Sequence, residues 1–299
     1  MTHRRAVAWM VLVTLMWSIA GVVTRHLDSA RAFEVTFWRS AFNALALVLL
    51  LLWWRGPWLL AHALKKGGRT LWMSGVCWSV MFTAFMVALT LTTVANVLVT
   101  MAIAPLLTAL VARSTLGHRL PMRTWMAIVV AGLGIGWMYG AQVSGDPRHV
   151  AGVLVALGVP FGAAVNWTVI QHNARGAGRP QDMLPAVLIG AVLSAAAALP
   201  LALPLAATPH DIGLLALLGV VQLAIPCLIA VTLAQVLSAP EISLLALLEV
   251  LFGVAWAWLG AGEEPSSGVM FGGALVLGAL AGNELVALRR QAPTTTVST

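Results

Sequence analysis

Hydrophobic and polar positions along the chain follow one pattern, in which long apolar runs are separated by short polar or charged breaks. A helix needs about 20 apolar residues to cross a hydrocarbon core, whereas a strand of a membrane barrel alternates over about ten. The runs here have the helical length. The breaks predict ten helical spans, near residues 6–24, 35–54, 70–90, 94–112, 124–143, 151–171, 183–203, 212–236, 242–260 and 267–285.

Two of the breaks indicate specific turns. The stretch between residues 70 and 112 carries no charge and is about twice the length of one helix, so we expect a tight hairpin near Thr92 and Thr93. The segment "PLAATPHD", residues 204–211, combines prolines with polar residues and predicts a surface turn between the seventh and eighth spans.

Composition agrees with this pattern. Hydrophobic residues make up 60% of the 299 positions and charged residues only 9%, and the mean hydropathy is +0.93. Soluble domains carry about 25% charged residues, so the chain is a polytopic membrane protein. Its first apolar run is longer than that of a signal peptide and lacks a small-residue cleavage site, so we expect it to be retained. Cys77 and Cys227 lie inside predicted spans and indicate neither a disulfide nor a metal site.

Basic residues predict the orientation in the membrane. With a cytoplasmic N-terminus, three cations fall in outside loops, namely Arg25, Arg31 and Arg148. Thirteen fall inside, namely Arg4, Arg5, Arg55, Lys65, Lys66, Arg69, Arg113, Arg119, Arg123, Arg175, Arg179, Arg289 and Arg290. The positive-inside rule therefore places both termini in the cytoplasm. We expect the membrane to be a bacterial inner membrane. The net charge of +7 is explained by topology and lipid headgroups and indicates no nucleic-acid partner.

An internal repeat predicts the architecture. A shift of 144 residues places residues 105–121 over 249–265, and both segments end at a proline before a glycine-rich final helix. We expect a first five-helix repeat at 1–143, a second at 144–290 and a disordered cytoplasmic tail at 291–299. Because five is odd, the second repeat enters from the opposite side, as in many secondary transporters. The final helices also carry small-residue spacings that allow close helix packing, Gly132 with Gly136 and Gly278 with Gly282.

The same shift identifies candidate site residues. Substrate sites of inverted-repeat transporters lie near the midplane between the halves. Three pairs of residues superimpose near the middle of their spans, namely Trp17 with Phe161, Trp78 with Gln222 and Pro105 with Glu249. A bulky aromatic, an amide and a carboxyl group therefore reach one depth of the membrane.

Three sequence stretches resemble a known family. The first reads "LMWSIAGVVTRHL", the second "FEVTFWRSAFNALAL" and the third "APLLTALVARSTLGHRL", followed by a glycine-rich helix. They are similar to the EamA type of the drug/metabolite transporter superfamily, and the Trp-rich core most resembles its YddG-type exporters of aromatic and other amino acids. The resemblance implies an all-α fold of ten transmembrane helices in two inverted repeats. It departs at two positions, because the family pattern favours Glu near His118 and Pro near Glu249.

Glu249 allows three interpretations. An ionisable group at the bilayer centre is unfavourable by at least about 2.5 kcal/mol and faces protein or water. It is either a protonated acid bonded to a neighbouring helix, a contact for a substrate ammonium group, or a proton-titrating switch.

The 13 tryptophans divide by depth. Nine fit interfacial belts, namely Trp9, Trp53, Trp54, Trp58, Trp72 and Trp125 on the inner side and Trp137, Trp256 and Trp258 on the outer side. Trp17 and Trp78 lie deeper, with Phe82, Phe85 and Phe161 at similar depth. This cluster is either core packing or the wall of a pocket for flat apolar ligands.

Other polar residues in the spans have a structural and a functional interpretation. For Arg39, near the outer end of its helix, snorkelling or pairing with Glu34 is favoured over binding of a carboxylate. Asn96, Asn166, Trp167 and Gln222 either bond a zwitterion or join helices. The candidate substrate-binding set is Trp17, Trp78, Phe82, Phe85, Met101, Phe161, Asn166, Trp167, Gln222 and Glu249. Pro105, Pro160 and Pro226 lie mid-span, where they permit bends that open a cavity or act as gates.

The sequence disfavours several function classes. It contains no P-loop and no His or Cys cluster at metal spacing, and its seven histidines fall at span ends or in loops, so we expect no enzyme, cofactor or metal. Rings of polar residues at successive depths, typical of a channel, are missing. We expect a secondary exporter of amino acids, aromatic ones in particular, that alternates access around helices one, three, four, six, eight and nine. The alternative is export of another small amphipathic metabolite or drug.

Overall fold

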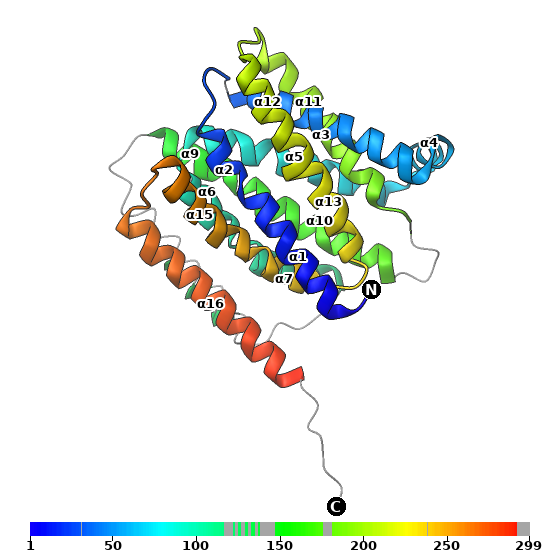
Figure 1. Cartoon of the computed structure of the whole chain (residues 1–299). Helices are drawn as coiled ribbons and strands as arrows, with labels where there is room; N and C mark the ends of the chain where they lie inside the picture. The colour runs from blue at the N-terminus through cyan, green and yellow to red at the C-terminus, as the bar shows by residue number, and fades with distance from the viewer. Residues whose placement is uncertain are drawn as a thin grey trace, which may run out of the picture.

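The computed structural model describes residues 1–30, 32–116, 147–175, 181–237 and 239–291, together with eight single positions between 122 and 137. Within this part of the chain all regular structure is helical, and no strand occurs (Figure 1). Eight helical segments are long and apolar enough to cross a membrane. The all-α fold class is therefore confirmed.

Most of the predicted spans coincide with helices of the structure. The helices are α1 (His3–Ser18), α2 (Ala20–Thr24), α3 (Ala32–Arg55), α4 (Pro57–Lys66), α5 (Arg69–Leu91), α6 (Val94–Met101), α7 (Ala104–Leu116), α9 (Pro147–Ala156), α10 (Gly158–Arg175), α11 (Leu184–Ala202), α12 (Pro209–Leu217), η1 (Leu218–Ala224), α13 (Ile225–Leu233), α14 (Ala239–Leu245), α15 (Leu247–Ala261) and α16 (Ser267–Gln291). The predicted fifth span, 124–143, lies mostly outside the described residues, as do its Gly132 and Gly136 and all of the predicted tail at 291–299 except Gln291.

The second half repeats the helix order of the first half, with the opposite orientation across the membrane. In the first half the chain breaks at Ala102 and Ile103 between α6 and α7, and adding 144 to 102 gives Ala246, the break between α14 and α15. The packing repeats as well, because α1 contacts α13 and α15 while α10 contacts α5 and α7. Two inverted copies of one unit therefore enclose the centre of the molecule.

Both predicted turns are present. Thr92 and Thr93 separate α5 from α6, and the Thr93 side chain accepts a hydrogen bond from the backbone of Asn96. At the second turn, Thr208 and Asp211 form a reciprocal capping box at the start of α12, which Pro209 begins. Such caps satisfy the free N–H groups of a helix that starts at the membrane surface.

The two ends of the bundle differ in charge. The end with Arg4, Arg55, Lys66 and Arg69 is here called the basic end, and the opposite end, formed around Arg25, Asp211 and Glu263, the capped end. Helix α4 lies at the basic end, where the sequence indicated only a loop. It follows Gly56, whose positive φ of 76° turns the chain away from α3.

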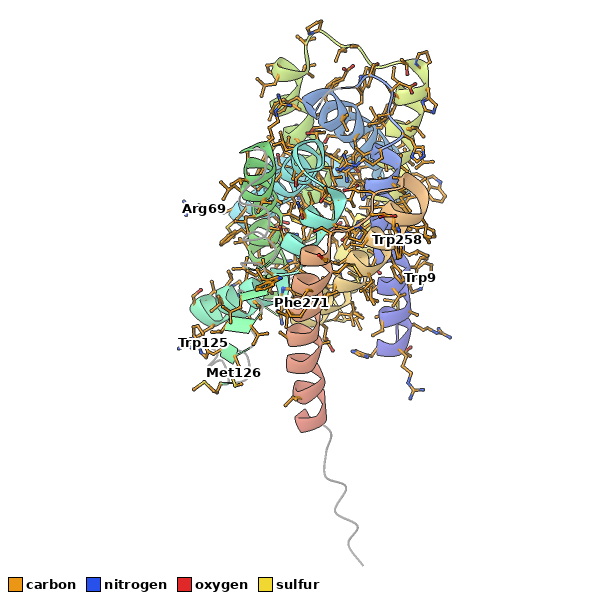
Figure 2. All side chains as sticks on the ribbon, turned by 90° about the vertical axis from the view of Figure 1, so that its left-hand side faces the viewer. Trp9, Arg69, Trp125, Met126, Trp258 and Phe271 are labelled. Carbon is orange, nitrogen blue, oxygen red and sulfur yellow. The ribbon has the colours of Figure 1, made fainter. Side chains whose placement is uncertain are left out.

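Tryptophans assigned to the interfacial belts lie on the outside of the bundle. All nine are at least 40% exposed, and Figure 2 shows Trp9, Trp125 and Trp258 pointing away from the helices. Helix α16 runs along the outer surface (Figure 1). A side chain built on its Gly278 or Gly282 would meet no described atom within 4 Å, and Gly132 and Gly136 of the first half lie outside the described residues.

Candidate functional site

A cavity lies between the two halves, lined by residues from the central parts of the helices. Its volume is about 90 Å³, enough for several waters. The lining comes from α1, α3, α5, α6, α7, α10, η1, α13, α14 and α15, with Ala246 at the α14–α15 break. Helix α3 was not among the helices expected to line the site, and it contributes Arg39.

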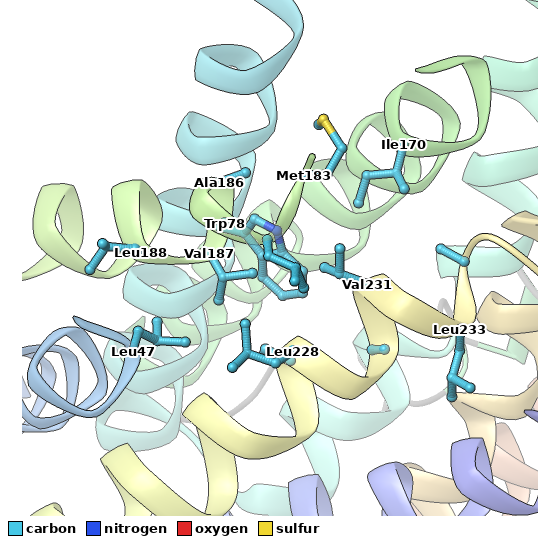
Figure 3. Close-up of a cluster of buried hydrophobic side chains, with 14 of the residues drawn as sticks. Leu47, Trp78, Ile170, Met183, Ala186, Val187, Leu188, Leu228, Val231 and Leu233 are labelled. Atoms are coloured by element: carbon cyan, nitrogen blue, oxygen red, sulfur yellow. The ribbon is translucent and has the colours of Figure 1, made fainter. Parts of the chain in front are cut away.

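Aromatic side chains form much of the cavity wall. The five aromatic residues are Trp17, Trp78, Phe82, Phe85 and Trp167. Trp78 packs against Phe82 with ring centroids 5.4 Å apart and meets Trp167 edge to face at 5.6 Å. Such geometry rigidifies the rings. Figure 3 shows that Trp78 also lies among the aliphatic side chains of Val187, Leu228 and Val231, which fix its position.

Arg39 is buried in the cavity wall, and the expectation that it snorkels or pairs with Glu34 is wrong. Its exposed fraction is 1%, and its Nη2 and Nε donate to Oε1 of Gln222 at 2.7 and 3.2 Å. The Phe85 ring lies 5.5 Å from its guanidinium carbon. Glu34 instead accepts hydrogen bonds from the backbone N–H groups of Ala206 and Ala207, in the loop before α12. The carboxylate that was expected to pair with Arg39 therefore binds this loop.

Gln222 is positioned by an irregular helix. It lies in η1, a π-helical turn that packs against α3. Gly219 permits this contact, because a side chain there would lie only 2.7 Å from the backbone oxygen of Arg39. The Gln222 amide also donates to the backbone oxygen of Trp17 at 3.0 Å. One side chain thus joins helices of both halves, and π-turns often occur at functional sites.

Glu249 lies in the first turn of α15, three residues after the break at Ala246. It is 6% exposed and lines the cavity. The free N–H groups at the start of a helix create a positive partial charge, which favours a carboxylate at this position. The broken helix therefore explains how a carboxyl group is accommodated where the family pattern has proline.

The candidate residues fall into two groups. Seven aromatic, amide or aliphatic candidates line the cavity together with Glu249, namely Trp17, Trp78, Phe82, Phe85, Met101, Trp167 and Gln222. Phe161 does not, because it is 54% exposed on the outside of the bundle. Asn166 is buried behind the wall, where its Oδ1 accepts a hydrogen bond of 2.6 Å from Ser74. Asn96 bonds Thr92 within its own turn.

The three mid-span prolines lie next to helix interruptions. Pro105 is the second residue of α7, Pro160 the third of α10 and Pro226 the second of α13. Only Pro160 of these lines the cavity. A helix that begins at proline loses no internal hydrogen bond, so each break is compatible with its proline.

Sequence reasoning missed further lining residues. Met81, Cys227 and Ser243 also face the cavity. Ser243 bonds Thr108 across the halves, with 3.1 Å between the hydroxyl oxygens. The charge of Arg39 inside an apolar span was the sequence signal for a place in the cavity wall. The depth of a residue, however, does not show which way its side chain points.

One group at the capped end resembles a metal site. Ligand atoms of Asp28, His210 and Asp211 lie within 4.8 Å of one another. Both Asp211 oxygens already accept backbone N–H groups, including those of Asp28 and Ser29. The cluster therefore fastens a loop to α12.

Comparison with known proteins agrees with this architecture. The profile of the EamA-like transporter family matches residues 4–140 and 150–283, one match for each half. Among 22 matching chains of solved structures, one described as "Crystal structure of protein" shares 17% sequence identity with a TM-score of 0.67, covering 95% of this chain and 99% of that one. This likeness supports the fold. No curated protein matches the chain. The chain belongs to the EamA-like transporter family, whose members are membrane transporters of small molecules.

Proposed function

We propose that this protein exports amino acids, aromatic or hydrophobic ones above all, by alternating access around the central cavity. One observation carries the proposal: a cavity between the halves has five aromatic side chains and several buried polar groups in its wall. Flat apolar side chains stack on such a wall, while a few polar groups fix the orientation of a ligand.

The size of the cavity requires movement. Its volume is about 90 Å³, whereas ligand pockets usually measure about 300–1,000 Å³. The halves must therefore separate at one end to admit an amino acid. The helix breaks at Ile19, Ala102, Leu157 and Ala246 border the lining segments and supply bending points.

The charge distribution supports an orientation with the basic end in the cytoplasm of a bacterial inner membrane. Cations of the described ranges at the basic end are Arg4, Arg5, Arg55, Lys65, Lys66, Arg69, Arg113, Arg175, Arg289 and Arg290. Those described at the capped end are Arg25 and Arg148. By the positive-inside rule both termini are then cytoplasmic.

A transport assay tests the function. Purified protein is reconstituted in liposomes, and uptake of labelled Trp, Phe, Thr and a cationic dye is measured with and without a pH gradient. We expect flux of Trp and Phe to exceed that of Thr. Flux of the dye alone would favour the amphipathic drug or metabolite alternative, and equal Trp flux in protein-free vesicles would reject amino-acid transport.

Trp78→Leu tests whether the aromatic wall contributes. Trp78 is 1% exposed at the cavity, whereas Trp53 is 88% exposed and provides the matched control Trp53→Leu. We expect Trp uptake at low concentration to fall about fivefold in Trp78→Leu, because ring contacts contribute about 1 kcal/mol each, and to stay unchanged in the control. Size-exclusion profiles check folding. An equal loss in both variants would contradict a role for the wall.

A further inference from the structure

The central cavity contains an arginine and a glutamate side chain that form no ion pair with each other. Arg39 and Glu249 both line it, and their exposed fractions are 1% and 6%. Among the ion pairs of the described residues, none joins these two. Each of the two side chains therefore keeps hydrogen-bonding capacity on the same small space.

Arg39 is held in place while part of its guanidinium stays available. Its Nε and Nη2 are fixed by Gln222, and Phe85 lies 5.5 Å away. Its Nη1 is buried and has no hydrogen-bond partner. A guanidinium carries five N–H groups, of which the Gln222 contact occupies two. The remaining edge has the fork geometry that binds a carboxylate through two parallel hydrogen bonds.

Glu249 supplies the complementary group. Its backbone N–H bonds Ala246, but no hydrogen bond to its carboxyl oxygens occurs among the described residues. A carboxylate is an acceptor for the three N–H groups of an ammonium ion. The cavity thus offers a donor for one end of a zwitterion and an acceptor for the other.

We infer that the site selects the zwitterionic backbone of a free α-amino acid. Arg39 binds the substrate carboxylate, Glu249 binds its ammonium group, and the side chain stacks on the wall around Trp78 and Trp167. Gln222 is a positioning residue that aims the guanidinium. This inference rests on the proposed amino-acid transport and adds the groups that recognise the substrate.

A site of this kind is expected to discriminate against molecules that lack either the carboxylate or the ammonium group of an amino acid. An amine without a carboxylate leaves Arg39 unpaired, and an acid without an ammonium group leaves Glu249 unpaired. Sites built to bond a polar group reject analogues that lack it more strongly than apolar pockets reject a missing methylene. Aromatic area alone gives no such preference, because all these analogues can keep the same ring.

Competition in proteoliposomes tests this selection. Uptake of labelled Phe is challenged with unlabelled Phe, phenylalaninamide, phenethylamine and 3-phenylpropionate, which share one ring. For the unaltered protein we expect Phe to compete at a concentration about tenfold lower than each of the others. Equal competition by all four would overturn the inference while leaving amino-acid transport intact. Absence of Phe uptake would overturn the proposed function itself.

Two variants assign the charges. In Arg39→Gln, the concentration of Phe needed to compete is expected to rise about tenfold, while that of phenylalaninamide stays the same. In Glu249→Gln, Phe is expected to compete no better than 3-phenylpropionate. Arg113→Gln in α7 and the exposed Glu264→Gln provide charge-matched controls outside the cavity. Equal weakening of the competition by all four compounds in a folded variant would show a structural role only and would overturn the assignment of that charge. If a variant does not fold, the competition series in the unaltered protein decides.

Discussion

The capped end and the basic end of the bundle are joined across the two halves by different kinds of contact. At the capped end, Arg25 of the first half pairs with Glu263 of the second at 3.1 Å. The same guanidinium donates to the backbone oxygens of Leu89 and Thr92, both at 2.9 Å. Glu263 also accepts the backbone N–H of Val94 at 2.8 Å. One ion pair thereby satisfies free groups at the end of α5 and the start of α6.

Two further carboxylates strengthen the capped end. Asp211 of the second half accepts the backbone N–H groups of Asp28, Ser29 and Ala30. Glu34 of the first half in turn holds the loop before α12. Hydrogen bonds to charged groups are stronger than neutral ones, and these lie on partly buried backbone.

The basic end has weaker links. Arg55 pairs with Asp182 at 3.4 Å, and the two side chains are 43% and 37% exposed. His3 contacts Glu241 at 3.1 Å, again between exposed side chains. Exposed pairs contribute about 0–1 kcal/mol. A cavity of about 760 Å³ also opens here, lined by Arg55, Lys66 and Asp182 among others.

This difference indicates which end opens more easily. Separation of the halves at the capped end breaks several charge-assisted bonds and exposes backbone groups. At the basic end, the ion pairs that join the halves within the described residues are the two solvated ones. We therefore expect the first opening of the cavity to occur at the basic end. The following predictions test this asymmetry, from the largest expected effect to the smallest.

Asp211→Ala removes the centre of the capped end. Loss of the helix cap and of three loop contacts is expected to reduce the free energy of unfolding by about 3 kcal/mol. Thermal inactivation of the detergent-solubilised protein measures the loss. Asp28→Ala is the control, because that exposed carboxylate bonds only His210 and Thr208 among the described residues and should change stability by less than about 1 kcal/mol. Similar losses in both variants would refute the ranking.

Glu263→Ala and Asp182→Ala compare the two ends directly. Spin labels at positions 26 and 264 report opening of the capped end, and labels at 53 and 235 report opening of the basic end. Glu263→Ala is expected to raise the open population at the capped end about tenfold, because it leaves Arg25 and Val94 without their carboxylate. Asp182→Ala should raise opening at the basic end about twofold at most. A larger effect of Asp182→Ala would reverse the comparison.

Salt provides the smallest perturbation. Raising ionic strength from about 0.1 to about 1 M shortens the Debye length from about 10 to about 3 Å and screens exposed charges. The label distance at the basic end is expected to shift slightly toward the open state, while that at the capped end stays constant. An equal shift at both ends would mean that the capped-end network is as solvated as the other.

Several features of the fold were predictable because they follow from local physics. Long apolar runs must form helices in lipid, and the turn at Thr92 and the capped turn at Thr208 mark where those runs end. The break at Ala246 was less accessible. It repeats the break at Ala102, yet no proline or glycine at 246 signals it, so the local sequence did not reveal that Glu249 begins a helix.

The candidate site was predictable only in part. Trp17, Trp78 and Glu249 were chosen by depth and do line one cavity. Phe161 was chosen by the same rule and lies on the outer surface. The repeat fixes depth along a helix but not rotation around it. For the same reason the burial of Arg39 could not be read from its position in α3.

Sequence alone determined that this chain crosses a membrane and how its apolar runs repeat. It also determined the depth of the polar and aromatic residues inside the spans. These properties depend on the hydropathy, length and charge of each segment taken separately. Only the tertiary structure decided which side chains meet. The contact between Arg39 and Gln222 depends on the close approach of η1 to α3, and the link from Arg25 to Glu263 joins residues 238 positions apart. Such contacts are set by the packing of helices from both halves, which no single segment encodes.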